Sequence, residues 1–211
     1  MPAVARGRFI TLEGIDGAGK STHIPAIRTF LAGRGITVHM TREPGGTPLG
    51  ESLRTMLLCE PMALDTETLL MFAARAEHLH RVIRPALDTG GWVVSDRFTD
   101  ATFAYQGGGR GMPIHRLVAL EQWVHGDLQP DLTLYFDVPV AVGMARREQA
   151  TSELDRFERE DPGFFQRVRD AYLERARLDP DRFRLIRTDV ELSAVKAAIE
   201  ETLSTFCSRC S

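Results

Sequence analysis

A glycine-rich segment near the start of the chain has the residue types needed to cradle phosphate groups. Residues 14–21 read Gly-Ile-Asp-Gly-Ala-Gly-Lys-Ser and match the pattern G-x-x-x-x-G-K-[ST]. Small residues let backbone N–H groups turn towards phosphate oxygens, and a helix that follows adds the positive end of its dipole. Lys20 would then reach the β- and γ-phosphates, and the Ser21 hydroxyl would ligate Mg²⁺. The segment predicts binding of a nucleoside triphosphate with Mg²⁺.

The alternative is a plain glycine turn with a surface lysine. Lys20 and Lys196 are the only lysines among 26 basic residues, the rest being arginine. We assign the phosphate-binding loop to Gly14, Ile15, Asp16, Gly17, Ala18, Gly19, Lys20, Ser21 and Thr22. This loop alone does not separate a kinase from a switch GTPase or an ATP-driven ligase.

An acidic and a basic residue follow the apolar pair at 93–94. Because ligands bind at the carboxyl ends of parallel strands, Asp96 could hold Mg²⁺ through water, as a Walker-B acid does. Arg97 beside it could clamp an anionic phosphate with two hydrogen bonds. The alternative is a surface ion pair at a strand end.

Two further segments carry side chains suited to a base. Thr102 and Gln106 are four apart, so they share a helix face, and a carboxamide matches the N3–H and O4 edge of thymine or uracil. The alternative is a polar helix end before Gly107. Phe72 could stack on a base or pack in the core. Arg75, in the same apolar helix, should face an anion or a carbonyl because an unpaired buried charge is costly.

Elements that would position these residues alternate along the chain. We expect strands at 8–12, 36–40, 92–94, 132–136 and 183–186, a loop at 44–48, and helices at 20–31, 49–58, 67–87, 99–105, 114–124, 140–147, 164–178 and 192–206. Glycines at 107–109 are expected to end the fourth of these helices, at 99–105. Alternating strands and helices predict an α/β fold of the P-loop NTPase type, with a five-stranded parallel sheet and helices on both faces.

The whole chain has the composition of a single globular domain. It has 211 residues, 43% hydrophobic and 26% charged, with a net charge of −3. This charge argues against nucleic acid as a partner, and no apolar run is long enough to cross a membrane. The segment 1–8 lacks the apolar core of a secretory signal, so we expect a cytoplasmic protein. The Cys207 and Cys210 pair is expected to lie in a frayed tail and not in a redox or zinc site.

These segments together resemble the bacterial thymidylate kinases, a family of P-loop nucleoside monophosphate kinases. The resemblance rests on the strings at 12–22, 41–47, 70–75, 96–98, 104–111 and 154–158. Among them, Arg-Glu-Pro-Gly-Gly and Ala-Tyr-Gln-Gly-Gly-Gly-Arg-Gly are the most specific. The resemblance implies one kinase domain over residues 1–211, a homodimer, and ATP-dependent phosphorylation of dTMP to dTDP on the route to dTTP.

The resemblance also implies roles for individual residues. Asp16 would hold the dTMP 3′-hydroxyl, Arg97 its phosphate, and Arg54 would lie near that phosphate. Phe72 would stack on thymine, Tyr105 would crowd the sugar to favour deoxyribose, and the base edge would be read by Arg75, Thr102 and Gln106. Pro44 would follow a cis peptide bond.

A polar stretch at 146–161 reads either as solvated surface or as a mobile lid, which we expect at about 143–160. Members of the family place an arginine either in the phosphate-binding loop or in the lid, and this loop has Gly17 at that position. The lid has Ala150-Thr151-Ser152 where the family has Arg-Gly, so its candidate cations are Arg146, Arg147 and Arg156. The catalytic set is then Lys20, Asp16 and Arg97 with Arg147 and Arg156.

Two other functions remain open from the sequence. One is a nucleoside monophosphate kinase acting on dUMP, UMP or CMP. The other is a non-catalytic nucleotide switch or sensor. The convergence of Arg75, Arg97 and Gln106 argues against a switch, which would not need a second nucleotide site.

Overall fold

A parallel sheet organises the computed structural model, which describes residues 6–150 and 154–210. The strands are β1 (Phe9–Glu13), β2 (Val38–Arg42), β3 (Trp92–Asp96), β4 (Leu132–Asp137) and β5 (Phe183–Arg187). They are hydrogen-bonded in the order β2-β3-β1-β4-β5, and every pairing is parallel. In this register Leu12 of β1 lies between Asp96 and Leu134. The five-stranded parallel sheet predicted from the sequence is confirmed, and it brings the loops after β1 and β3 to one edge.

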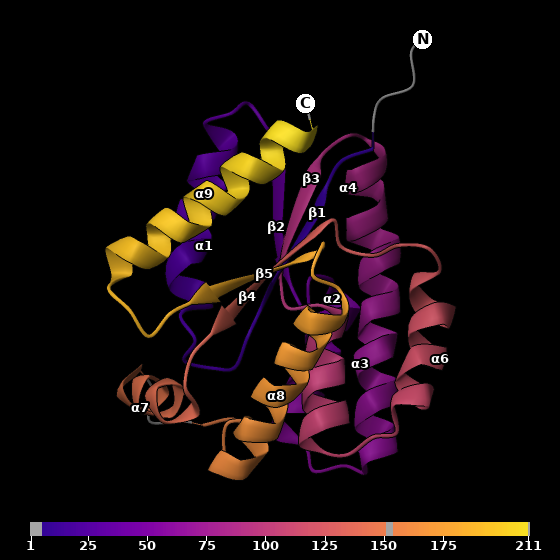
Figure 1. Cartoon of the computed structure of the whole chain (residues 1–211). Coiled ribbons are helices and arrows are strands. Elements are labelled where there is room, and N and C mark those ends of the chain that lie inside the picture. The colour runs from indigo at the N-terminus through magenta and orange to yellow at the C-terminus, as the bar shows by residue number, and fades with distance from the viewer. Residues whose placement is uncertain (1–5, 151–153, 211) are drawn as a thin grey trace.

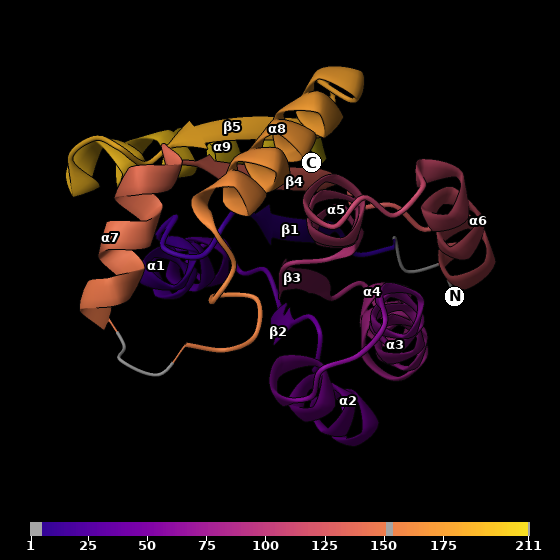
Figure 2. The same ribbon diagram turned by 90° about the horizontal axis from the view of Figure 1, so that it is seen from below.

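Helices cover both faces of the sheet. Helices α1 (Lys20–Ala32) and α9 (Leu192–Cys210) lie together on one face (Figure 1). The opposite face carries α4 (Arg84–Asp88) and α8 (Pro162–Leu178), with α3 (Leu64–His78) and α6 (Ile114–His125) side by side further out (Figures 1 and 2). The remaining helices are α2 (Pro48–Cys59), α5 (Thr99–Thr102) and α7 (Val140–Ala150), with the π-helical segments η1 (Leu79–Ile83) and η2 (Phe103–Gly109).

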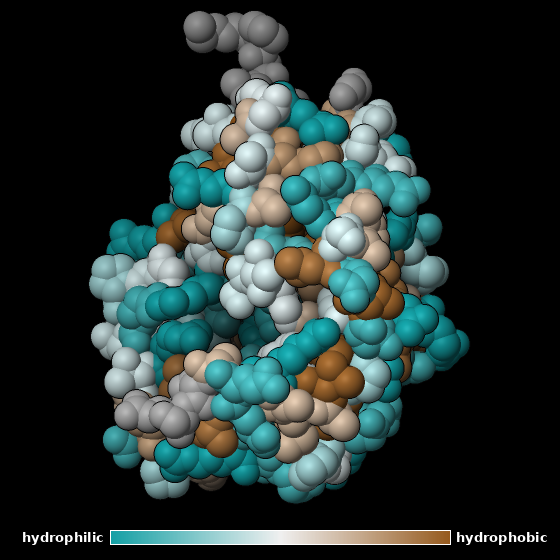
Figure 3. Space-filling model, turned by 90° about the vertical axis from the view of Figure 1, so that its left-hand side faces the viewer, coloured by the Kyte–Doolittle hydropathy of each residue, from teal (hydrophilic) through white to brown (hydrophobic). Residues whose placement is uncertain are grey.

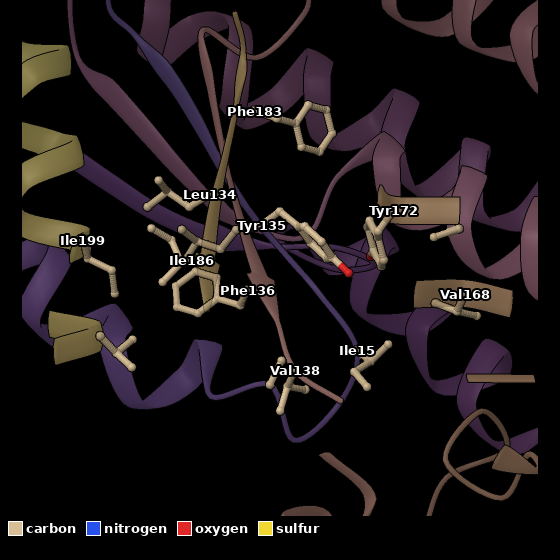
Figure 4. Packing of buried hydrophobic residues seen from close by; sticks show 14 of the residues in the cluster. Ile15, Leu134, Tyr135, Phe136, Val138, Val168, Tyr172, Phe183, Ile186 and Ile199 are labelled. Atoms are coloured by element: carbon tan, nitrogen blue, oxygen red, sulfur yellow. The ribbon is translucent and has the colours of Figure 1, made fainter. Parts of the chain in front are cut away.

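Strand β4 lies in the centre of the core. All 6 of its residues are buried, as expected for a parallel strand covered on both faces. Leu134 and Phe136 point towards α9, whereas Tyr135 points the other way and stacks on Tyr172 of α8, with ring centroids 5.1 Å apart (Figure 4). Packing on both faces fixes the strand next to the one that carries the phosphate-binding loop.

Several predicted boundaries are wrong for local reasons. Strand β2 begins at Val38 and not at residue 36, because it is a half-exposed edge strand whose apolar pattern does not mark its ends. Pro48 is the first residue of α2 and not part of a loop, since the Thr47 hydroxyl accepts a hydrogen bond from the Gly50 N–H at 2.9 Å and caps the helix. The C-terminal cysteine pair lies in the last turn of α9 and not in a frayed tail.

The helix predicted to stop at residue 105 includes the glycines at 107–109 as its last residues. The chain continues through them as η2, which packs closely against α8. A Cβ on Gly108 would lie 2.6 Å from the Ala171 Cβ, and a Cβ on Gly109 would lie 2.4 Å from the Phe164 ring. These glycines therefore allow two helices to approach each other, a tertiary requirement that local turn signals cannot reveal.

Candidate active site

The phosphate-binding loop connects β1 to α1 and turns on glycines. Gly14, Gly17 and Gly19 have positive φ values of 140°, 79° and 89°, a region that favours glycine. Lys20, at the first position of α1, is 7% exposed. Its ammonium donates to the carbonyl oxygens of Gly14 at 2.9 Å and Ile15 at 3.1 Å. Burial, with the Arg97 charge nearby, lowers the pKa of Lys20. The carbonyl oxygens of the loop therefore hold the Lys20 ammonium within the loop.

An ion pair joins this loop to the end of β3. Arg97 has a φ of 69°. Its Nη2 donates to Asp16 Oδ1 at 2.7 Å, and the Tyr105 hydroxyl donates to Asp16 Oδ2 at 3.1 Å. Burial acts to raise the pKa of Asp16, but Arg97 and Lys20 outweigh it and lower this pKa to about 2. Asp16 is therefore an anion between two cations, at the junction of the loop and a neighbouring cleft.

A buried carboxylate supports Arg97 from below. The Arg97 Nη1 donates to the Tyr172 hydroxyl at 3.2 Å, and that hydroxyl donates to Glu13 Oε2 at 2.8 Å. The other Glu13 oxygen accepts from the Phe98 N–H at 2.7 Å. Burial, with Asp100 nearby, raises the pKa of Glu13 to about 7. Neither Glu13 nor Tyr172 was given a role from the sequence, although Glu13 lies in the string 12–22, because their contacts join segments that are far apart in the chain.

A cleft beside the loop collects most of the predicted acceptor-site residues. Those that line it are Asp16, Arg54, Arg75, Arg97, Thr102, Tyr105 and Gln106, with Glu43, Pro44, Leu58, Met71, Phe98, Ala101, Asp155 and Phe157. They come from α2, α3, α5, η2 and the loops at the sheet edge. The structure thus brings the predicted arginines, the threonine and the amide to one cleft.

Arg75 is buried in the cleft wall with one nitrogen to spare. Its Nε donates to Glu43 Oε2 at 2.7 Å, and its Nη2 donates to Thr102 Oγ1 at 2.9 Å and to the Phe98 carbonyl at 3.1 Å. Its Nη1 is buried and has no hydrogen-bond partner among the described residues. A buried unpaired donor is costly, so this nitrogen is suited to a carbonyl oxygen of a ligand.

Phe72 does not line the cleft, so it is not placed to stack on a base there, contrary to expectation. It packs with Phe103, Met112 and Leu117 in a separate hydrophobic cluster. Met71, four residues before Arg75, shares that residue's helix face and lines the cleft in its place. The Phe72 ring centroid lies 4.8 Å from the Arg75 guanidinium, so the ring supports the arginine instead.

A cis peptide bond shapes the opposite wall, as the resemblance implied for Pro44. The bond joins Glu43 to Pro44, and the Pro44 carbonyl accepts a hydrogen bond from Arg54 Nη1 at 3.0 Å. Glu43, which is 4% exposed, also bonds the buried His78 at 2.9 Å. Neither Glu43 nor His78 was given a role from the sequence. Both in fact fix the position of Arg75.

A second hollow lies on the other side of the phosphate-binding loop. It is lined by Ala18, Gly19, Thr22 and His23, by Arg146 of α7, and by Thr188, Val190, Glu191, Leu192 and Val195 around the start of α9. Figure 3 shows the face of the molecule that carries α1, α7 and α9, hollowed and bordered by hydrophilic residues. The loop therefore has a depression on each side.

Comparison with known proteins identifies the family. A family model of thymidylate kinases matches residues 12–199. The chain belongs to the thymidylate kinase family. It is 60% identical to a thymidylate kinase of Methylobacillus flagellatus over 95% of this chain and 98% of that protein. It is 58% identical to a thymidylate kinase of Nitrosomonas europaea over 96% of this chain and 95% of that protein. The crystal structure of the Ehrlichia chaffeensis thymidylate kinase, 33% identical, superposes with a TM-score of 0.77 over 94% of this chain and 99% of that one.

The predicted metal ligands of this thymidylate kinase, Ser21 and Asp96, fit Mg²⁺ only if waters and phosphate oxygens complete its coordination. Asp96 Oδ1 is buried without a hydrogen-bond partner among the described residues, and Ser21 lies exposed in the first turn of α1. No group of three or more His, Cys, Asp or Glu residues in the described part of the chain could hold a metal alone. Mg²⁺ suits such a site, because it usually keeps waters and takes phosphate oxygens as ligands.

The arginines of the predicted lid lie in different surroundings. Arg147 of α7 is 6% exposed, with its guanidinium 5.0 Å from the Phe165 ring centroid and its Nε unpartnered among the described residues. Arg146 Nη2 donates to the Thr188 carbonyl at 2.8 Å. Arg156 instead bonds Glu67 at 2.6 Å and the Leu57 carbonyl, which places it on the acceptor side of the cleft. Thr151 and Ser152 lie outside the described residues.

Proposed function

We propose that the chain catalyses the reaction of its family, transfer of the γ-phosphate of ATP to dTMP to give dTDP and ADP for dTTP synthesis. The observation that carries this proposal is the Asp16–Arg97 pair. It lies where the phosphate-binding loop meets a cleft whose wall offers an unpaired arginine donor and an amide. Two nucleotides bound on either side of this pair would meet phosphate to phosphate.

ATP would occupy the loop and the hollow beside it. Its phosphates would lie on the N–H groups of residues 14–22, with Lys20 moving from the loop carbonyls to the β- and γ-oxygens. The nucleoside would lie in the hollow near Thr188 and Arg146. Ser21 and Asp96 would hold Mg²⁺, directly and through water, and the metal would neutralise charge on the phosphates.

The cleft would bind dTMP. The free Arg75 Nη1 would donate to O4 of thymine, with Gln106 at N3 and Thr102 beside them. Tyr105 would crowd the sugar, and Asp16 would accept from the 3′-hydroxyl. Arg97, with Arg54 nearby, would bind the phosphate and so exchange part of its contact with Asp16 for the substrate.

Transfer would then depend on alignment and charge neutralisation. A dTMP phosphate oxygen attacks the γ-phosphorus in line, and it is already ionised, so no strong general base is needed. Lys20 and Arg97 face the reacting phosphates. Among the lid arginines, Arg147 is better placed than Arg156 to add positive charge, because Arg156 is engaged by Glu67. Closure of residues 143–160 would exclude water and limit ATP hydrolysis.

We also propose that the protein is a cytoplasmic homodimer. The outer face of α3 and α6 carries exposed apolar side chains, among them Leu69 (54% exposed) and Trp123 (81%). These side chains border a mainly apolar groove. A groove bordered by exposed apolar side chains suits a second copy of the chain. None of the helices in the described ranges is long and apolar enough to span a membrane.

The test is ADP release from ATP and Mg²⁺ with a panel of nucleoside monophosphates. We expect dTMP to give the highest kcat/KM, with dUMP next and CMP and UMP far lower. ADP release that does not depend on any monophosphate would overturn the proposal. A clear preference for dUMP, UMP or CMP would instead assign the chain a different acceptor.

A further inference from the structure

One buried carboxylate outside the cleft wall bonds a cleft residue. Glu67 of α3 is 1% exposed. Its Oε1 accepts from Gln106 Nε2 at 2.8 Å and from Arg110 Nε at 2.9 Å, and its Oε2 accepts from Arg156 Nη1 at 2.6 Å. Glu67 does not itself line the cleft, whereas Gln106 does. Among the hydrogen-bond partners of Glu67, Gln106 is the one that lines the cleft, so it is the direct route from Glu67 to a bound base.

The chemistry of these groups fixes the orientation of the amide. A carboxylate paired with two guanidinium groups only accepts hydrogen bonds, so the end of Gln106 that faces Glu67 must be the NH₂ group. The carbonyl oxygen of Gln106 is then the atom left to face the cleft. Without such a partner, a carboxamide could turn over and present either end, because oxygen and NH₂ have nearly the same size.

We propose that Glu67 is a positioning residue that makes Gln106 a hydrogen-bond acceptor towards the base and thereby selects pyrimidines that carry a proton on N3. Thymine and uracil have an N3–H donor. Cytosine presents a bare N3 acceptor, which would face the Gln106 oxygen with no proton between them. The proposal rests on the acceptor site proposed above.

The expected size of the effect follows from burial. A site built to hydrogen-bond one partner rejects an analogue that leaves its buried polar groups unpaired. Arg75 Nη1 adds to the same preference, because a donor near position 4 of the base favours the keto group of thymine or uracil over the amino group of cytosine. Glu67 therefore accounts for part of the discrimination, on the order of one hydrogen bond, or about tenfold.

The test is the Glu67→Gln variant with dTMP, dUMP and dCMP as acceptors. The new side chain has the same shape but can donate to the Gln106 oxygen, so the amide is free to turn over. We expect kcat/KM for dTMP and dUMP to fall together while that for dCMP does not fall, so the dTMP/dCMP ratio drops about tenfold. General damage to the site would lower all three alike. A folded variant with an unchanged dTMP/dCMP ratio would overturn this proposal and would leave the proposed kinase function standing.

Two controls assign the effect to Gln106. Arg110→Gln removes another partner of Glu67 but leaves the bond to Gln106, and it should keep the wild-type ratio. In a Gln106→Ala background, Glu67→Gln should no longer change the ratio. A change of the same size in either control would refute the route through the amide.

A measurement on the unmodified protein covers the case in which Glu67→Gln does not fold. The side-chain NH₂ signal of Gln106 in an amide NMR spectrum is identified by its loss in Gln106→Ala. With the NH₂ group bonded to Glu67, one proton should be shifted downfield and protected from exchange, and it should stay so when dTMP is added. An NH₂ signal that exchanges freely with solvent would show that this group does not bond Glu67 and would overturn the proposal.

Discussion

At the residue scale, the site depends on charges that are held in place before a ligand arrives. Arg97 has three hydrogen-bond partners in Asp16, Tyr105 and Tyr172, and Lys20 has two backbone carbonyls. On the proposed function, phosphate oxygens would replace the two Lys20 contacts and part of the contact between Arg97 and Asp16, while Tyr172 keeps its bond to Arg97. Groups arranged in this way stabilise developing charge without the cost of reorganising at the moment of reaction.

The two lysines of the chain offer a matched test of the phosphate-binding loop. Lys20→Ala should lower kcat by about 10²–10³-fold, because it removes the cation closest to the transferring phosphates. Lys196→Ala removes an exposed lysine on α9, 3.8 Å from Glu200, and should change nothing. Steady-state kinetics with a thermal unfolding scan would separate catalysis from folding. Turnover near the normal rate in Lys20→Ala would refute the role of the loop.

A sequence motif assigns roles to residues only where the functional residues are neighbours in the chain. The phosphate-binding loop could be placed from the sequence because its residues are neighbours in the chain. Phe72 was misplaced because periodicity assigns a helix face but does not separate two positions that are next to each other on it. Glu43 and Glu67 were missed because an acidic residue in a polar context reads as solvated, whereas their burial depends on arginines more than 30 positions away.

At the scale of elements, helix α8 links the sheet to the acceptor side. Tyr172 from α8 is bonded to β1 through Glu13 and to the end of β3 through Arg97. Its ring stacks on Tyr135 of β4, so one side chain connects three strands and a helix. The position of Arg97 therefore depends on how α8 packs against the sheet. Helix α8 directly follows the predicted lid in the chain.

Two stacked tyrosines allow this dependence to be measured. Tyr172→Phe removes the hydroxyl bonded to Arg97 and Glu13, so KM for dTMP should rise about three- to tenfold while KM for ATP stays the same. Tyr135→Phe removes an equally buried hydroxyl that bonds Asp137 instead, and it should leave both values unchanged. Equal effects of the two variants on KM for dTMP would show that α8 does not position Arg97.

The sheet order and the main helices could be predicted because alternating strands and helices leave few arrangements. The π-helical η2 could not be predicted, because its glycines serve a contact with α8 that is more than 50 residues away in sequence. Local signals define where an element can begin or end. Contacts between elements decide whether it does.

At the scale of the whole molecule, burial of a histidine links stability to pH. His125 is 0% exposed beside Phe98, and neither of its ring nitrogens has a hydrogen-bond partner among the described residues. Burial, with the Arg75 charge, lowers the pKa of His125 from its ordinary 6.5 to about 3. The folded protein thus keeps this side chain neutral at a pH where the unfolded chain protonates it. Stability from this source is complete above about pH 6.5 and is lost as the pH falls towards 3.

Denaturant unfolding at several pH values tests this linkage. Between pH 6 and 4 the free energy of unfolding of the wild type should include a loss from His125 of about 1 kcal/mol per pH unit, and His125→Leu should lack it. His115→Asn, at an exposed position of α6, should keep the wild-type slope. The linkage is wrong if His125→Leu and the wild type lose stability in parallel.

The apolar face of α3 and α6 sets the expected assembly. Trp123→Glu places a charge on that face and should shift the protein from dimer to monomer in sedimentation velocity. Leu178→Glu changes a side chain that is 66% exposed at the end of α8, away from this face, and should leave the dimer intact. A dimer that survives Trp123→Glu at micromolar concentration would place the interface elsewhere.

The contact between Gly17 and α7 restricts how this enzyme can evolve. A Cβ at Gly17 would lie 2.0 Å from the carbonyl oxygen of Gly143, and φ at this position is +79°. An arginine placed at position 17 by a single mutation would therefore collide with the backbone of α7. The backbone of α7 would have to shift first, with no benefit until the second change arrives. On the proposal that the lid supplies this charge, we expect that substitutions of the lid arginines in this chain have no rescue by a single change at Gly17.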